Sequence, residues 1–143
     1  VLRQIIMDHY QYPRNHQLSE EEGYVQRHMA SDSCIDDIYV QGKVEDGVVK
    51  DIRFDGEACT ISTASTSIMS ELVKGKRVDD ARKIMDNYFA MVDQKEYDED
   101  LLEEAVAFAN VGRQANRINC ATIGWRALRE ILDESEGKTD EQE

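Results

Sequence analysis

Residues Asp55–Ser70, with the sequence DGEACTISTASTSIMS, join a segment of strand-like alternation to a segment of helical periodicity, and Cys59 falls at the junction. Seven of the eleven residues from Thr60 to Ser70 are serine or threonine, which favour helices only weakly. The apolar residues that recur at helical spacing are Ile61, Ala64, Ile68 and Leu72. We therefore expect a helix that forms only when tightly packed. Cys59 would lie at its N-terminal end, where unpaired N–H groups and the helix dipole favour a thiolate.

Two strands are predicted ahead of this junction, joined by a tight turn. Asp37–Val44 and Val48–Asp55 both alternate apolar with polar residues, and the intervening Asp46-Gly47 favours a hairpin turn. Tyr24–Met29 is a weaker strand candidate. The alternation places Val49 on the outer face of its strand. The pattern predicts an antiparallel meander with one buried face.

Helical periodicity covers the first residues and most of the chain after the sheet. An amphipathic segment from Leu2 to His9 ends before Pro13, the only proline in the chain. Later helices are predicted at 81–92, 101–109 and 121–132, separated by a charged loop at 93–100 and a polar connector at 113–117. Because the strands precede most of the helices, the predicted fold class is α+β rather than alternating α/β. We assign residues 1–132 to a single domain and residues 133–143 to an acidic C-terminal tail.

Composition restricts the classes of function. The chain has 143 residues, of which 41% are hydrophobic, and its formal net charge is −13. This length suits one core, and the apolar content argues against a disordered chain. The negative charge argues against binding to nucleic acid or to an anionic membrane. No apolar run is long enough to cross a bilayer and no signal peptide is evident, so a cytoplasmic location is expected.

The chain has three cysteines, Cys34, Cys59 and Cys120. An odd, widely spaced set is not a disulfide framework, and by count alone it is typical of buried small hydrophobes. All three nevertheless lie at the ends of predicted elements rather than on apolar faces, and Asp36 adds an oxygen beside Cys34. Three thiolates and one carboxylate suit zinc, or iron bound with sulfide. The spacing itself carries little weight, because no pair forms Cys-x-x-Cys.

The three histidines add no further ligand to this prediction. His9 lies on a predicted helix face, His16 in a loop and His28 in the weaker strand. Each is expected to be structural or exposed. The sequence also lacks a glycine-rich phosphate loop and a serine in a nucleophile elbow.

Several segments carry motifs in a fixed order along the chain. They are His9-Tyr10 with Pro13-Arg14-Asn15, Cys34-Ile35-Asp36, the segment 56–65 (GEACTISTAS) and the segment 117–125 (RINCATIGW). In these motifs the chain resembles the IscU/SufU/NifU N-terminal family of iron–sulfur cluster assembly proteins. The resemblance spans most of the chain, and the segments around Cys59 and Cys120 are highly specific.

The resemblance implies a fold, a site and a partner. The fold would be a three-stranded antiparallel sheet packed against about five helices. The metal or cluster site would comprise Cys34, Asp36, Cys59 and Cys120, and the partner would be a cysteine desulfurase, with downstream iron–sulfur assembly or acceptor proteins beyond it.

Within this family the chain is more similar to the SufU-type branch. The scaffold branch has a histidine directly before its last cysteine, whereas this chain has Asn119. The zinc-dependent sulfur-acceptor branch lacks that histidine and has extra residues between the second and third cysteines, which the loop at 93–100 and the following helix resemble. In that branch Arg117 matches a basic residue near the site.

The chain also departs from the family pattern. Ser31-Asp32 stands where the family usually has Asn-Pro, Ile35 where it has glycine after the first cysteine, and Ala115 where it has a proline. A β-branched residue resists backbone conformations that glycine permits. We expect the departures to affect the loop around Cys34 more than metal binding, because all four implied ligands are kept.

The preferred functional hypothesis is a zinc-dependent sulfur acceptor in iron–sulfur cluster assembly. Cys34 would receive persulfide sulfur from the desulfurase, and Arg117 would pair with anionic sulfur or with Asp36. The protein would be a sulfurtransferase-like acceptor rather than an enzyme with conventional turnover. One alternative is a scaffold on which iron or a [2Fe-2S] cluster is assembled at the same four residues and then transferred. A second alternative is a non-catalytic zinc-binding interaction module.

Overall fold

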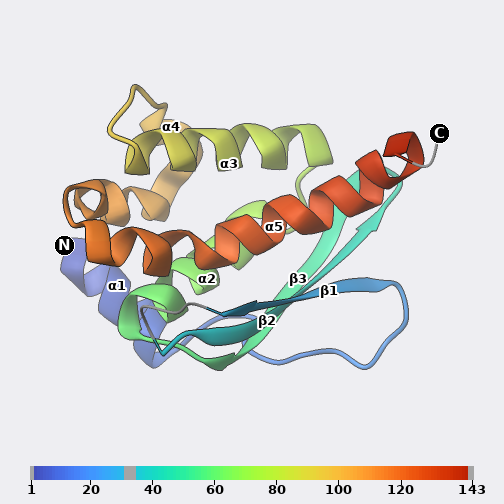
Figure 1. The fold of residues 1–143 in the computed structure, drawn as a ribbon, viewed down its shortest axis with the longest axis horizontal. Helices are drawn as coiled ribbons and strands as arrows, with labels where there is room; N and C mark the ends of the chain where they lie inside the picture. The colour runs from blue at the N-terminus through green and yellow to red at the C-terminus, as the bar shows by residue number, and fades with distance from the viewer. Residues whose placement is uncertain (1, 31–34, 142–143) are drawn as a thin grey trace.

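The computed structural model describes residues 2–30 and 35–141. Its elements are α1 (Leu2–Gln11), β1 (Tyr24–Ala30), β2 (Asp37–Glu45), β3 (Val48–Glu57), α2 (Thr60–Val73), α3 (Val78–Val92), α4 (Glu99–Leu102), η1 (Glu103–Arg113) and α5 (Ala115–Glu141). The strands form one antiparallel sheet in the order β1-β2-β3 (Figure 1). The predicted α+β fold is therefore confirmed.

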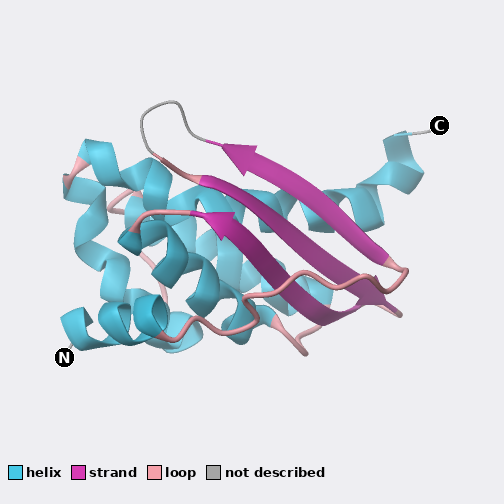
Figure 2. Ribbon diagram, turned by 90° about the horizontal axis from the view of Figure 1, so that it is seen from below, coloured by secondary structure: helices cyan, strands magenta, loops and turns pink. Residues whose placement is uncertain are grey.

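The helices cover one face of the sheet and extend beyond one of its ends (Figure 2). The long helix α5 runs along the molecule and contacts β1 and β2, while α2 contacts β3. The core lies between the inner face of the sheet and the helices α2, α3 and α5. Among the described residues, no helix is both long enough and apolar enough to cross a bilayer.

The turn between β2 and β3 follows the sequence prediction, but the strand after it does not. Asp46 and Gly47 both have positive φ, 56° and 75°, as a two-residue type I′ hairpin requires. Lys43 pairs with Asp51, whereas Val44 pairs with Val49, so Lys50 is an extra residue in β3. A bulge of this kind interrupts the alternation, so the side chains before it and after it do not follow one continuous pattern of faces. The predicted outward position of Val49 is therefore wrong, and its side chain is buried.

The hydroxyl-rich helix α2 lies at the centre of the helical layer, as its composition required. All residues from Ser62 to Ser70 are buried. Ser65 donates a hydrogen bond of 2.6 Å to the carbonyl oxygen of Ala121 on α5, and the Trp125 indole N–H donates to the Ser65 hydroxyl at 3.2 Å. Tyr88 stacks on Trp125 with ring centroids 4.1 Å apart. The small hydroxyl side chains thus let α2 and α5 pack closely while satisfying buried polar groups.

The N-terminal motif joins α1 to α2. His9 is 2% exposed, and its Nδ1 lies 2.7 Å from the hydroxyl oxygen of Ser67. The Arg14 backbone N–H donates to the same hydroxyl at 2.8 Å, and the Asn15 amide donates to Ser70 at 2.9 Å. The motif and the serines of α2 therefore form one hydrogen-bonded unit, and His9 is structural, as predicted.

The helices after α3 differ from the prediction in regularity and length. Residues 101–109 were expected to form one helix, but Glu103, with φ 47° and ψ −122°, separates the short α4 from the 3₁₀ segment η1. The last helix begins at Ala115, within the predicted connector. It also continues past residue 132, where Asp133 pairs with Arg82 at 3.0 Å. The assignment of 133–143 as a separate tail stays a prediction.

Candidate metal centre

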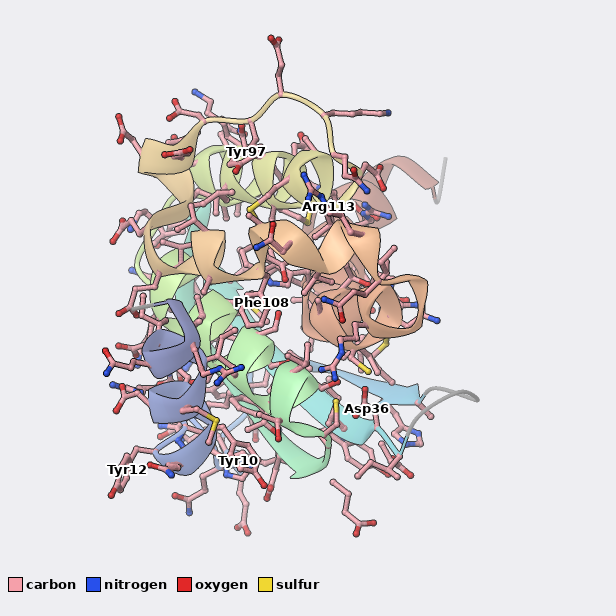
Figure 3. The ribbon with its side chains drawn as sticks, turned by 90° about the vertical axis from the view of Figure 1, so that its left-hand side faces the viewer. Tyr10, Tyr12, Asp36, Tyr97, Phe108 and Arg113 are labelled. Atoms are coloured by element: carbon pink, nitrogen blue, oxygen red, sulfur yellow. The ribbon has the colours of Figure 1, made fainter. Side chains whose placement is uncertain are left out.

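Three of the four predicted ligands converge at one end of the molecule. Asp36 lies directly before β2, Cys59 is the N-cap of α2, and Cys120 lies in α5. Figure 3 views this end of the molecule, with Asp36 between the strands and α5 and with Tyr10 and Tyr12 at the opposite edge. Asp36 is 2% exposed and Cys120 is 6% exposed, whereas Cys59 is half-buried. The predicted convergence of these three residues is observed.

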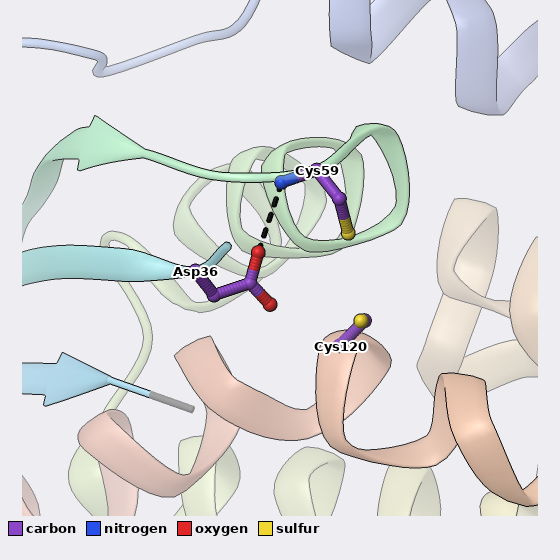
Figure 4. A group of neighbouring side chains, drawn as sticks. All are labelled: Asp36, Cys59 and Cys120. Atoms are coloured by element: carbon purple, nitrogen blue, oxygen red, sulfur yellow. Dashed lines mark hydrogen bonds between the residues drawn. The ribbon is translucent and has the colours of Figure 1, made fainter. Parts of the chain in front are cut away.

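The geometry of this group fits a tetrahedral metal ion. One carboxylate oxygen of Asp36 and the Sγ atoms of Cys59 and Cys120 all lie within 4.8 Å of one another (Figure 4). A tetrahedral zinc ion with bonds of roughly 2.3 Å separates its ligand atoms by about 3.8 Å. The three atoms would therefore need to approach by no more than about 1 Å. Two sulfurs and one oxygen form a donor set suited to zinc or iron.

Cys34, the fourth predicted ligand, lies outside the described residues, so its role stays a prediction. Its neighbour Ile35 is described, and its side chain is 70% exposed. The departure from the family's glycine therefore places a large apolar side chain at the surface, one residue before the buried Asp36. This exposed side chain contributes to a surface hollow of about 510 Å³, together with Tyr10, Pro13 and Ala58.

Asp36 is held by the start of α2 through both of its carboxylate oxygens. Oδ1 accepts a hydrogen bond of 2.9 Å from the backbone N–H of Cys59, shown as the dashed line in Figure 4. Oδ2 accepts a hydrogen bond from the hydroxyl of Ser62. These bonds satisfy a buried carboxylate and one of the unpaired N–H groups at the helix start. Asp36 therefore has a fixed position relative to Cys59.

Cys59 occupies the helix-capping position that the sequence predicted. Its Sγ accepts a hydrogen bond of 3.4 Å from the backbone N–H of Ser62, as the side-chain oxygen of an N-cap serine would. The sulfur thus lies at the positive end of the α2 dipole.

Cys120 differs from its predicted position at a helix start. Since α5 begins at Ala115, Cys120 is the sixth residue of the helix. It lies beyond the first four residues, whose N–H groups lack intrahelical acceptors. The helix terminus therefore contributes less to Cys120 than to Cys59. The rigid helix backbone fixes its position instead.

Arg117 lies in the first turn of α5, about one turn before Cys120. It borders a hollow of about 420 Å³ together with Arg3 and Ile61. Within the residues that the structure describes, Arg117 makes no ion pair, and the carboxylate of Asp36 is bonded to Cys59 and Ser62 instead. A supporting role for Arg117 therefore stays a prediction.

The histidines lie outside the metal-binding group. His9 bridges Ser67 and Glu104, and His28 contacts Asp37 with Nε2 2.5 Å from Oδ1. His16 lies 3.5 Å from Asp55. Among the described residues, none of the three belongs to the group of Asp36, Cys59 and Cys120.

Sequence reasoning missed Ser62 as a residue of this site. Ser62 was counted only as one of many hydroxyl residues in α2, yet it contacts both Asp36 and Cys59. Its position, three residues after the N-cap, was a usable sign, because that residue's N–H bonds the capping side chain. The contact with Asp36 depends on how β2 meets α2 and has no local signature.

A three-stranded meander, a covering layer of helices and a cysteine–aspartate group at one end define an iron–sulfur cluster assembly protein of the IscU/SufU type. The chain belongs to the NifU-like N terminal domain family, whose model matches residues 2–142.

Individual relatives agree with this assignment. The chain is 37% identical to the zinc-dependent sulfurtransferase SufU of Bacillus subtilis over 136 residues, covering 94% of this chain and 91% of that protein. It is 36% identical to the iron–sulfur cluster assembly scaffold protein IscU of Thermotoga maritima over 100 residues, or 70% of each chain. The crystal structure of a SUF-system scaffold protein from Fervidobacterium islandicum matches with a TM-score of 0.82 at 28% identity, covering 90% of this chain and 94% of that one.

Proposed function

We propose that this protein is a zinc-dependent sulfur acceptor that works with a cysteine desulfurase in iron–sulfur cluster assembly. The observation that carries the proposal is the group of Asp36, Cys59 and Cys120, whose donor atoms fit a zinc ion. Two further observations support the zinc-dependent branch. Asn119 replaces the histidine of the scaffold branch, and the relative from Bacillus subtilis, named for zinc-dependent sulfur transfer, matches along 94% of the chain.

The residues divide into a holding set and a reacting residue. Cys59 and Cys120 are fixed by α2 and α5 and would hold the metal, with Asp36 as the oxygen ligand. A bound zinc ion would keep its sulfur ligands deprotonated at neutral pH. Cys34, two residues before Asp36, would be the reacting thiolate.

The transfer of sulfur to Cys34 needs no added oxidant or reductant, because one S–S bond forms as another breaks. The Cys34 thiolate attacks the outer sulfur of the desulfurase persulfide and forms a new S–S bond. The S–S bond within the desulfurase persulfide breaks, and the desulfurase cysteine leaves as a thiolate. The outer sulfur, with its proton, then forms a persulfide on Cys34. The acceptor stores this sulfur until cluster assembly consumes it.

Mass spectrometry of the full chain after incubation with a cysteine desulfurase and cysteine tests the proposal. We expect the wild-type chain to gain the mass of one sulfur atom on Cys34 and the Cys34→Ser variant to gain none. Cys59→Ser is the matched comparison, because it retains Cys34 but loses a holding ligand. Undiminished sulfur transfer to Cys34→Ser would contradict the proposal.

A scaffold function is the second candidate, supported by the scaffold proteins among the relatives. The same donor set can hold iron with sulfide. Anaerobic reconstitution with iron and sulfide, followed by visible absorbance, separates the two functions. A stoichiometric cluster that transfers to an apo-ferredoxin would favour the scaffold. If Cys34→Ser has no effect on sulfur transfer or cluster supply while zinc stays bound, the remaining interpretation is a zinc-binding interaction module.

A further inference from the structure

Ser62 is a buried residue that contacts two members of the metal-binding group. Its side chain is fully buried, at 0% exposure. The hydroxyl bonds Oδ2 of Asp36, and its oxygen lies 3.4 Å from Sγ of Cys59. The backbone N–H of Ser62 also donates to Cys59 Sγ at 3.4 Å. One residue therefore contacts the oxygen donor through its side chain and a sulfur donor through both side chain and backbone.

Through Ser62, the segment that leads into β2 is joined to the start of α2. Asp36 directly precedes β2, whereas Cys59 is the N-cap of α2 and Ser62 lies in its first turn. Within the part of the chain that the structure describes, the other hydrogen bond to the Asp36 carboxylate comes from the backbone N–H of Cys59. A carboxylate held at both oxygens cannot rotate freely about its side-chain bonds, whereas one held at a single oxygen can. The Ser62 hydroxyl is the half of this anchor that a side-chain substitution removes.

We propose that Ser62 is a positioning residue of the metal centre, which aligns Asp36 with Cys59 so that the oxygen and sulfur donors can bind one zinc ion together. This inference rests on the proposed function, because it assumes that Asp36, Cys59 and Cys120 bind zinc. Residues that orient metal ligands by hydrogen bonding contribute about 10- to 100-fold to metal affinity. Ser62 acts through the ligands and is not itself a ligand.

The first test is zinc affinity, measured on the full chain by competition with a chromophoric chelator. We expect Ser62→Ala to bind zinc about 10- to 100-fold more weakly than the wild type. Ser62→Thr, which retains the hydroxyl, is expected to recover most of this loss. Circular dichroism of each variant without metal verifies that the chain is folded before the titration.

Ser65→Ala is the matched control. Ser65 is also a buried serine of α2, one turn further along, but its hydroxyl bonds the Ala121 carbonyl and the Trp125 indole instead of the metal-binding group. We expect this variant to unfold at a lower temperature and to keep the zinc affinity of the wild type. Equal losses of affinity in Ser62→Ala and Ser65→Ala would mean that Ser62 acts only through general stability, which would overturn the inference.

A double-variant experiment identifies the ligand through which Ser62 acts. If the hydroxyl positions Asp36, then Ser62→Ala must have a smaller effect in an Asp36→Ala background than in the wild type. An unchanged effect in that background would contradict positioning of Asp36. The cobalt-substituted chain supplies a spectroscopic readout, because sulfur-to-cobalt charge-transfer bands report on Cys59 and Cys120. At saturating cobalt we expect these bands to remain in Ser62→Ala, with the visible ligand-field bands altered.

The outcomes separate the inference from the proposed function. If the wild-type chain binds no zinc, or if Cys59→Ser and Cys120→Ser bind zinc with unchanged affinity, the proposed zinc site is wrong. The role of Ser62 is then wrong as well. If wild type binds zinc through these cysteines while Ser62→Ala binds it equally well, only the positioning role is overturned.

Discussion

The backbone N–H of Cys59 donates a hydrogen bond of 2.9 Å to Oδ1 of Asp36, which links two members of the metal-binding group directly. The bond connects the start of α2 to the segment that leads into β2. The oxygen and sulfur donors are thus placed relative to each other by the protein itself. A site arranged in this way loses less conformational entropy when a metal binds than one assembled from mobile segments.

Asp36→Asn separates the charge of this ligand from its hydrogen bonds. The amide oxygen can still accept from Cys59, and the amide nitrogen can donate to the Ser62 hydroxyl oxygen. We therefore expect the variant without metal to unfold at nearly the wild-type temperature, while zinc affinity falls by roughly tenfold or more because a carboxylate ligand is lost. Thermal unfolding and chelator competition measure the two quantities. A large loss of stability without loss of affinity would contradict a ligand role for Asp36.

Zinc removal is expected to lower stability, because an ion that binds only the folded chain stabilises it by mass action. At a free zinc concentration one hundred times the dissociation constant, the stabilisation is about 2.7 kcal/mol. For a chain of this size that corresponds to a shift of several degrees in unfolding temperature. Calorimetry with zinc or with EDTA measures the shift. Cys120→Ser is expected to show little shift, and a full shift in that variant would exclude Cys120 as a ligand.

Gly124, within the Cys120 motif, is expected to be required for the close contact between α5 and α2. A Cβ atom at this position would lie 2.4 Å from the hydroxyl oxygen of Thr66. Overpacking of this kind costs about 1–3 kcal/mol, so Gly124→Ala is expected to destabilise the chain in urea unfolding. Thr66 is buried, and its hydroxyl has no hydrogen-bond partner among the residues that the structure describes.

The double variant Thr66→Ala with Gly124→Ala is the control for this contact. Alanine at position 66 lacks the threonine hydroxyl and methyl groups, which removes the contacts at 2.4 and 3.0 Å but leaves the one at 3.0 Å with the Cβ atom. Alanine also favours a helix over glycine by up to about 1 kcal/mol. We expect Gly124→Ala to be less destabilising in this background than in the wild type, with a coupling of at least about 1 kcal/mol. Additive effects of the two substitutions would show that the contact does not limit packing.

The sequence predicted the elements best where one pattern was sufficient. Alternation identified β2 and β3, and Asp46-Gly47 identified their turn. The same alternation could not show the extra residue Lys50, because a bulge changes the pairing and not the composition. Val49 was therefore placed on the wrong face. The helical spacing at 101–109 correctly marked a buried face, but it did not reveal the left-handed backbone at Glu103 that separates α4 from η1.

For the site, the sequence was most informative about residues at element ends. Cys59 at the strand-to-helix junction and Asp36 before β2 lie where they were predicted. The positions at element ends made Cys120 a candidate for the same group, and the family resemblance then implied the ligand set, because the spacing alone has no metal-binding pattern. Ser62 was missed because its importance arises from a contact across 26 positions of sequence. Local patterns carry no information about such a contact.

His9 is expected to stabilise the fold by joining three segments. Its ring nitrogens bond Ser67 on α2 and Glu104 on η1, at 2.7 and 2.9 Å. His9→Ala removes both bonds and leaves a buried cavity, so we expect a loss of about 1–3 kcal/mol in urea unfolding. His28→Ala is the control, because the hydrogen bond of His28 with Asp37 is exposed at the surface. Its loss is expected to stay below about 1 kcal/mol, and equal losses would contradict the role given to His9.

Asp51 is expected to make the fold less stable in acid. Burial raises its pKa, but hydrogen bonds from Tyr24, Arg53 and Lys74 outweigh burial, and the net pKa is lowered from its ordinary value of 3.8. As the pH falls below about 3.8, the unfolded chain takes up a proton that the folded chain binds only at lower pH. The stabilisation from Asp51 is therefore present above this value and is lost as the pH falls through the folded-state pKa.

The measurement is the free energy of unfolding in urea between about pH 6 and pH 3. Asp51→Asn is expected to be less stable than the wild type at pH 6 and to lose less stability on acidification, so the two curves converge. Asp46→Asn is the matched control, because Asp46 is exposed in a positive-φ turn position that asparagine also adopts. Its curve should follow the wild type throughout. Parallel curves for Asp51→Asn and the wild type would show that the bonds of Asp51 do not lower its pKa.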